Sequence, residues 1–366
     1  MKKNTFLTFV FCLSLYAEGV SSKPIEVAFL NPGGDHWFWE MTIEFMQAAA
    51  EDLDIKVEVI TSDRGHLLTV RQAAEVVNRE NPPDYIVTGN EKSNAGEVIR
   101  IANQAGVNVL LINNGFVDPQ QIEEFGDPGE RYGYWIGEII PDNFSAGYKI
   151  GEKLISRALE LGLKGDNGKV NIAAIAGTKK THSSVERVRG LRKAVEEHSG
   201  KANLLQVFPG DWTAERAKSI GRGLFRRYEE TDVVWGVNDS SALGAMDAAV
   251  SLGIKPGEDV LFGGCGWYLP AIQKVKEGVL STTVGGHFME AGWAMVMIYD
   301  FHHGKSLEPD QIKTEMLSID RNNVEKLPEE FFNQEWGEVD FKKFSKVYNP
   351  DIKKYDFNVK SVLQQL

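Results

Sequence analysis

The sequence of 366 residues has only two cysteines, Cys12 and Cys265. Cys12 lies in an N-terminal apolar stretch, so its removal would leave one thiol and no internal disulfide. The seven histidines are scattered at spacings that fit no metal site, and the sequence has no phosphate-binding loop and no Gly-x-Ser-x-Gly elbow. We therefore expect no catalytic residues, no metal and no cofactor, and predict that the chain is not an enzyme.

An excess of basic charge is also missing. The formal net charge is −12, whereas a nucleic-acid binder needs a basic face, so we expect no nucleic-acid partner. The composition is 42% hydrophobic and 25% charged, which is typical of a globular protein, and the length is ample for two domains.

The N-terminus has the pattern of a secretory signal peptide. Lys2 and Lys3 precede an apolar run over residues 6–15, which is too short to span a bilayer. We expect a cleavable signal over residues 1–22 and an exported protein, periplasmic where the host has two membranes. No later run is long and apolar enough for a membrane helix.

The most informative stretch lies between a short apolar strand at residues 231–235 and an alanine-rich helix at 242–250. In open α/β sheets, ligands bind at the carboxyl ends of strands. Asn238 can donate and accept hydrogen bonds there, and Asp239 can accept them from hydroxyl groups. The alternative is that Asp239 and Ser240 only cap the helix.

The run Asn238-Asp239-x-x-Ala-Leu-Gly-Ala resembles the second lobe of periplasmic sugar-binding proteins of the ribose-binding type, which share their fold with LacI-like repressors. The layout is also similar to the autoinducer-2 receptor branch. The resemblance implies an α/β fold with two Rossmann-like lobes, whose parallel sheets are joined by a three-crossing hinge. The implied divisions are 25–139 plus 286–315 for the first lobe, 140–285 plus 316–335 for the second, and a tail at 336–366 packed on both.

In the first lobe, the resemblance places ligand contacts at three positions. Trp37 and Phe38 match a pair of aromatic residues that stack on sugar rings, although they could instead form a hydrophobic staple at the helix start. Asn90, with Glu91 beside it, matches a polar contact, and loop solvation is its alternative. Asn113 stands where the family often has an aspartate followed by an arginine.

In the second lobe, Arg187 matches an arginine whose fork can bind two hydroxyls or a carboxylate, while a solvated helix face is the alternative. Trp212 often has an aromatic counterpart near the ligand in the family, although it could instead simply pack the lobe. Cys265 stands where sugar binders have an aspartate, and His287 is the polar side chain nearest to another family contact. We therefore expect common hexoses to be poor ligands.

The resemblance implies an exported solute-binding protein that captures a small sugar-like or polyhydroxylated ligand between its lobes for an ABC importer. The alternative is a periplasmic receptor subunit that signals to a membrane sensor kinase or cyclase. The partners would be the ligand and either an ABC permease or a membrane sensor protein. A secreted enzyme on the same fold is a third possibility, without a catalytic motif to support it.

Overall fold

The computed structural model describes residues 23–34 and 36–366. The expected signal peptide at 1–22 lies outside the described residues. Among the helices within them, none combines the length and apolar character needed to cross a membrane.

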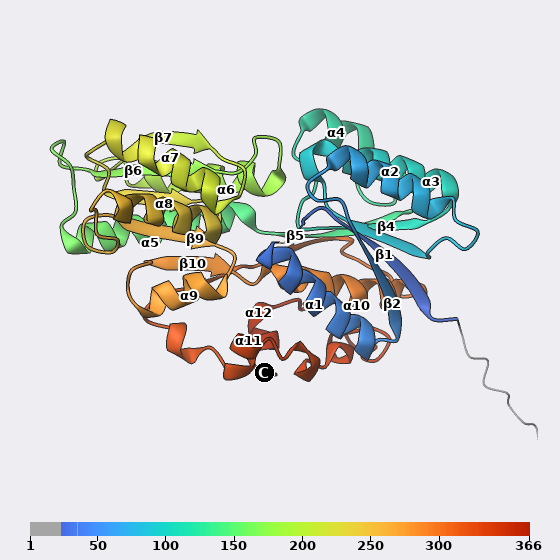
Figure 1. Cartoon of the computed structure of the whole chain (residues 1–366). Coiled ribbons are helices and arrows are strands. Elements are labelled where there is room, and N and C mark those ends of the chain that lie inside the picture. The colour runs from blue at the N-terminus through green and yellow to red at the C-terminus, as the bar shows by residue number, and fades with distance from the viewer. Residues whose placement is uncertain (1–22, 35) are drawn as a thin grey trace, which may run out of the picture.

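Two six-stranded sheets form the centres of two lobes (Figure 1). The first has the order β2-β1-β3-β4-β5-β11, with every pair parallel. The second has the order β7-β6-β8-β9-β10-β12, and only its edge strand β12 runs antiparallel to its neighbour. The strands are β1 (Ile25–Asn31), β2 (Ile55–Thr61), β3 (Tyr85–Thr88), β4 (Asn108–Ile112), β5 (Trp135–Pro141), β6 (Val170–Ala176), β7 (Ala202–Pro209), β8 (Val233–Gly236), β9 (Leu261–Cys265), β10 (Thr282–Gly285), β11 (Gln311–Thr314) and β12 (Leu317–Ile319).

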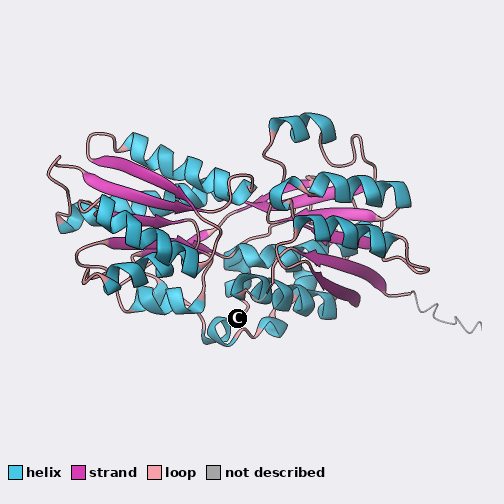
Figure 2. Cartoon of the chain, turned by 45° about the horizontal axis from the view of Figure 1, so that its top comes forward, coloured by secondary structure: helices cyan, strands magenta, loops and turns pink. Residues whose placement is uncertain are grey.

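Helices cover both faces of each sheet (Figure 2), so the central strands are buried on both sides and read as continuous apolar runs. This confirms the α/β fold of two lobes with mostly parallel sheets. The α-helices are α1 (Trp37–Asp52), α2 (His66–Val77), α3 (Ala95–Ala105), α4 (Pro119–Phe125), α5 (Asn143–Leu161), α6 (His182–Glu197), α7 (Ala214–Arg227), α8 (Asp239–Ser251), α9 (Leu269–Lys276), α10 (Glu290–His302), α11 (Glu329–Asn333) and α12 (Val359–Leu363). The 3₁₀ helices are η1 (Glu91–Ser93), η2 (His287–Met289), η3 (Val324–Lys326), η4 (Trp336–Glu338) and η5 (Phe341–Phe344).

One segment differs from the sequence-based expectation. Residues 119–134 read as a long loop, but the structure has the short helix α4 at its start. Asp118 accepts a hydrogen bond from the Gln120 N–H at 2.9 Å, and Pro119 occupies the first helical turn, where its missing N–H costs nothing. The capping pair is visible in the sequence, and only the acidic, glycine-rich surroundings hid it.

The chain passes between the sheets three times. It leaves β5 for α5 near Asp142, leaves β10 for η2 and α10 near Gly286, and leaves β11 for β12 near Glu315. The three passages place the lobes side by side around a common hinge, with β5 visible between them in Figure 1.

The tail over residues 336–366 packs on the first lobe. Phe45 of α1 meets the rings of Trp336 and Phe341 at centroid distances of 5.5 and 5.2 Å, and Phe357 stacks on Trp293 of α10 at 5.5 Å. The segment just before the tail contacts the second lobe, where α9 meets η3. The C-terminal segment therefore runs below α1 and α10, alongside the hinge (Figure 1).

Candidate ligand-binding cleft

A cavity of about 290 Å³ lies between the lobes, at the carboxyl ends of their strands. Pro32 follows β1, Ser62 follows β2 and Asn113 follows β4, while Asn238 follows β8 and Cys265 ends β9. Parallel strands bring their carboxyl ends to one edge of each sheet, and the hinge turns the two edges toward each other. The cavity is therefore built from both lobes.

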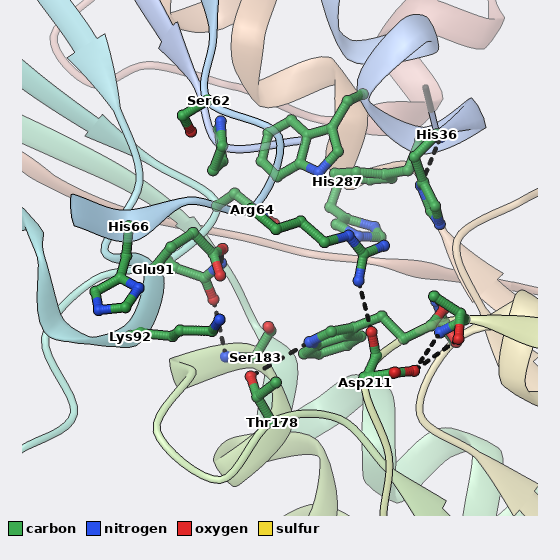
Figure 3. Close-up of a pocket in the computed structure, with 18 of the residues that line it drawn as sticks. His36, Ser62, Arg64, His66, Glu91, Lys92, Thr178, Ser183, Asp211 and His287 are labelled. Atoms are coloured by element: carbon green, nitrogen blue, oxygen red, sulfur yellow. Dashed lines mark hydrogen bonds between the residues drawn. The ribbon is translucent and has the colours of Figure 1, made fainter. Parts of the chain in front are cut away.

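The two lobes touch across the cleft through polar groups. Arg64 donates to the carbonyl oxygen of Asp211 at 2.6 Å, as Figure 3 shows, and Ser183 N–H donates to Asn114 Oδ1 at 3.0 Å. In each pair the first-lobe residue lies in a loop at a strand end, and its partner lies in a loop or at a helix start of the second lobe. The lobes are therefore in a closed arrangement.

Trp37 adds to this closure. Its indole Nε1 donates to Ser240 Oγ at 3.0 Å, and its ring stacks on Tyr268 at a centroid distance of 4.5 Å and an interplanar angle of 18°. Trp37 also lines the cavity. The structure thus places it at the cavity wall, with part of its aromatic surface already taken up by the other lobe.

Three further aromatic side chains line the cavity: Phe38, Trp39 and Trp212. Phe38 is buried and stacks on the His287 imidazole at 4.6 Å. Trp212 has a left-handed backbone (φ 77°), and its Nε1 donates to Thr178 Oγ1 at 3.4 Å. Aromatic faces of this kind can pack against the C–H faces of a sugar ring.

Arg187 forms the hinge side of the cavity and is only 3% exposed. Its guanidinium donates to Asn143 Oδ1 at 2.8 Å, to the Val237 carbonyl at 3.0 Å and to His287 Nε2 at 3.2 Å. Asn143 and His287 each follow a passage between the lobes, so the arginine is held where the lobes join. The alternative prediction, that Arg187 lies on a solvated helix face, is therefore wrong.

Three buried atoms of cavity-lining residues have no hydrogen-bond partner among the described residues: His36 Nε2, Asn113 Oδ1 and His287 Nδ1. Asn113 has a left-handed backbone (φ 62°). Burial, followed by the charge of Arg187, holds the pKa of His287 well below its ordinary value. The His287 imidazole is therefore neutral, and each of the three residues has a polar atom that a ligand could satisfy.

Cys265 and Asn238 also line the cavity. Burial raises the pKa of the Cys265 thiol to about 12, so it stays protonated and makes only weak hydrogen bonds. Asn238 caps α8 by accepting from Ser241 N–H at 2.9 Å, and its amide donates to the Trp212 carbonyl at 3.0 Å. Much of its hydrogen-bonding capacity is therefore used inside the protein.

The structure places two of the expected contacts outside the cavity lining. Asn90 accepts from Ala95 N–H at 3.0 Å and donates to the Gly115 carbonyl at 3.2 Å, which makes it a support for the loop. Asp239 is fully buried and accepts from Tyr268 N–H and from the Thr283 hydroxyl. Burial raises the pKa of Asp239 to about 7. Both side chains are turned to the protein because short polar residues at strand ends and helix starts readily bind nearby backbone.

Several lining residues were not predicted from the sequence. They come from the segments that follow β2 and β3, including the start of α2 and the 3₁₀ helix η1, and from the start of α6, and they are Ser62, Arg64, His66, Lys92 and Ser183 (Figure 3). Glu91 lines the cavity beside Lys92, and burial raises the pKa of its carboxyl to about 7. The signal that could have identified these residues was their position in the sequence, because the segments after β2 and β3 each follow a strand end.

Within residues 23–34 and 36–366, no cluster of three or more histidine, cysteine, aspartate or glutamate side chains could hold a metal ion. The side chains that line the cleft offer aromatic packing, hydrogen bonds and the charge of the cationic groups.

Comparisons with known proteins agree with this geometry. Residues 27–305 match the family model described as a periplasmic binding protein domain. The ribose import binding protein of Haemophilus influenzae is 24% identical over 285 residues, covering 78% of this chain and 87% of that protein. The crystal structure of a periplasmic sugar-binding protein from Pseudomonas fluorescens superposes with a TM-score of 0.82 at 32% identity, covering 92% of this chain and 99% of that one. A galactofuranose-binding protein shares the fold at 17% identity, with a TM-score of 0.74 over 85% of this chain and 99% of that one.

Proposed function

Because this chain belongs to the periplasmic binding protein domain family, we propose that it captures a small sugar or other polyhydroxylated molecule between its lobes and delivers it to an ABC importer. The family, the ribose import relative and the sugar-binding structural neighbour support this function. Closure of the lobes around the ligand, by rotation at the three-strand hinge, would be the working step.

One observation carries the proposal: the cavity of about 290 Å³ between the lobes combines aromatic walls with buried polar atoms that lack partners among the described residues. A buried polar atom without a hydrogen bond costs about 1–3 kcal/mol, so a ligand that supplies the bond gains affinity. The volume of the cavity is at the lower end of the range for ligand pockets, which fits a molecule of monosaccharide size.

Our proposed ligand contacts are Trp37, Phe38, Asn113, Arg187, Trp212, Cys265 and His287, and the loop residues Arg64 and Glu91 join them. Asn238 would act mainly through the loop that it fixes, and Asn90 and Asp239 would support the cleft from outside.

The test is a thermal-shift screen of the mature protein against pentoses, hexoses, sugar acids and polyols, followed by calorimetry of the hits. A ligand that binds only the folded state raises the melting temperature. We expect at least one carbohydrate to bind with a dissociation constant in the micromolar range or below. If none of them binds, the proposed function is wrong.

The partner and the export route belong to the same proposal. We expect the loaded protein to stimulate ATP hydrolysis by its permease complex in proteoliposomes, whereas a signalling subunit would leave transport untouched and alter the activity of a membrane sensor. We also expect the mature protein recovered from a periplasmic extract to begin near residue 23, and N-terminal sequencing tests this.

A further inference from the structure

We propose that the carbohydrate bound in this cleft carries a carboxylate, as aldonic and uronic acids do, and that Arg187 and His287 hold it. The inference rests on the proposed function above, because it names the class of carbohydrate for the same cavity. Around the hinge side of the cleft, unpaired N–H donors and positive charge exceed the unpaired acceptors and negative charge among the described residues.

Arg187 is a buried cation whose three hydrogen bonds all go to neutral groups: an amide oxygen, a backbone carbonyl and an imidazole nitrogen. Within the described part of the chain, no aspartate or glutamate lies at ion-pair distance from it. A charge that is buried without a counter-ion is costly, and the cost falls when an anion is brought beside it. A guanidinium has five N–H groups, so two remain for a ligand.

Two buried carboxyl groups, those of Asp239 and Glu290, feel the positive charge of Arg187. Neither forms an ion pair with Arg187: Asp239 accepts from Thr283, and Glu290 Oε1 accepts from Thr314, while Glu290 Oε2 has no hydrogen-bond partner among the described residues. Burial also raises both pKa values, that of Asp239 to about 7 and that of Glu290 well above its ordinary range. Their negative charge is therefore weakened in the folded protein.

His287 adds a donor at the same place. Arg187 can only donate, so His287 Nε2 must accept in the bond between them, and the single proton of the neutral imidazole lies on Nδ1. Nδ1 is buried and has no partner among the described residues. Two N–H groups of Arg187 and one of His287 thus await an acceptor. A carboxylate only accepts, whereas a hydroxyl must also place its own proton.

Fewer groups on this side of the cleft need a hydrogen-bond donor from the ligand. Asn113 Oδ1 is an unpartnered acceptor of a cavity-lining residue, and it calls for a hydroxyl that donates. Cys265, protonated at neutral pH, supplies no anion. The ligand that fits this pattern is a hydroxy acid, with its carboxylate toward Arg187 and hydroxyl groups toward Asn113 and the polar wall.

The cleft mouth has a similar charge pattern. Arg64 and Lys92 line the cavity from exposed positions, and neither forms a salt bridge within the described residues. Two acids face them. Burial raises the pKa of Glu91 to about 7, and Asp211 turns its carboxylate to Thr213 N–H and Oγ1. Although the whole chain has a net charge of −12, the cleft therefore attracts anions locally.

The experiment compares matched pairs of ligands by calorimetry on the wild-type mature protein: D-gluconate with D-glucitol, D-galactonate with D-galactitol, D-glucuronate with D-glucose, and D-galacturonate with D-galactose. We expect the tightest ligand to be an acid that binds at least about tenfold more tightly than its neutral counterpart, since hydrogen bonds to charged groups are the stronger ones. If a neutral member binds as tightly or more tightly, sugar binding stands and this inference falls. If no member of either kind binds, the proposed function falls with it.

Two substitutions at one position separate charge from shape. Cys265→Asp places a carboxylate at the cavity wall near Arg187, and Cys265→Asn is its uncharged match. We expect Cys265→Asp to reduce the preference for the acid over its neutral counterpart by at least about tenfold, and Cys265→Asn to keep the acid preferred. Equal preference in the two variants would contradict the inference. Their melting temperatures report whether each one folds, and the comparison of wild-type ligand pairs decides the matter independently of both.

Discussion

The indole of Trp37 donates a hydrogen bond to the hydroxyl of Ser240 at 3.0 Å, from the first turn of α1 in one lobe to the first turn of α8 in the other. Both residues lie at the start of a helix that follows a strand end, so the bond can form only when the two edges of the cleft are together. It therefore links the closed arrangement to a single pair of atoms.

We predict that Trp37→Phe weakens ligand binding about 2- to 12-fold, which corresponds to the 0.5–1.5 kcal/mol of one neutral hydrogen bond. The phenyl ring keeps the contact with Tyr268 but removes the donor. Calorimetry with the tightest carbohydrate of the screen measures the loss.

Ser240→Ala is the matched partner in a double-mutant cycle. It should cost about as much as Trp37→Phe, and the double variant should cost little more than either alone. Additive losses would show that the two residues act on binding independently, and that the bond does not stabilise the closed form.

Gly266 lies beneath the same indole. Its φ is 142°, and a Cβ added there would lie 2.3 Å from the Trp37 ring. We predict that Gly266→Ala weakens binding at least about tenfold. The added methyl group would clash with the Trp37 ring and displace it, and the positive φ would strain the alanine backbone. Gly253→Ala is the control, since that glycine also has positive φ (80°) but has open space around its Cβ position. Loss of stability in both variants with normal binding in both would refute the steric role.

Protonation of His36 should destabilise the folded protein in weak acid. Its Nδ1 caps α1 by accepting from Phe38 N–H, and burial, followed by the charge of Arg64, lowers its pKa to about 4. An unfolded histidine has a pKa of about 6.5, so the unfolded chain binds more protons between these values. The free energy of unfolding therefore falls as the pH drops from about 6.5 to 4.

We predict that His36→Asn, which keeps a side chain able to cap but does not titrate, loses less stability than wild type over this range. Urea denaturation of the ligand-free proteins at pH 7.5 and 4.5 measures the difference. His303→Asn, at an exposed position, provides a histidine-to-asparagine control. Parallel pH profiles of the unfolding free energy for wild type and His36→Asn would show that His36 does not cause the loss of stability in weak acid.

Much of the fold follows from local patterns in the sequence. Short aliphatic runs alternate with helical segments, and the run at 170–176 forms β6 because an apolar run between polar turns has few alternatives to a buried strand. The start of α4 was missed although Asp118 and Pro119 marked it, because the acidic residues after them resemble a solvated loop.

The cleft was only partly predictable, since sequence position gives the strand end but not the direction of the side chain. Asn113 and Trp212 have positive φ, which no local pattern predicted. Trp267 also follows a strand end, but it is fully buried and donates to the Leu317 carbonyl. Arg64 lines the cavity and donates to the Asp211 carbonyl of the second lobe, 147 residues away in the sequence, which no local pattern could pair with it.

Asp300, at 0% exposure, anchors the tail to α10. Its carboxylate accepts from the Ser345 hydroxyl at 2.5 Å, from Lys346 N–H at 2.7 Å, from Val347 N–H at 3.2 Å and from the Tyr355 hydroxyl at 3.0 Å. A carboxylate can accept about four hydrogen bonds, so the site is fully used. Without it, buried donors of the tail would have no acceptor, each at a cost of about 1–3 kcal/mol.

We therefore predict that Asp300→Ala lowers the free energy of unfolding by at least about 3 kcal/mol and exposes the tail to limited proteolysis before the lobes are cut. Asp356→Ala, an exposed acid of the same tail, should change stability by less than about 0.5 kcal/mol. The tail covers Phe45 and Trp293 with its own rings, so its release should also increase binding of a hydrophobic dye. A stable Asp300→Ala variant with a protected tail would mean that aromatic packing alone holds this segment.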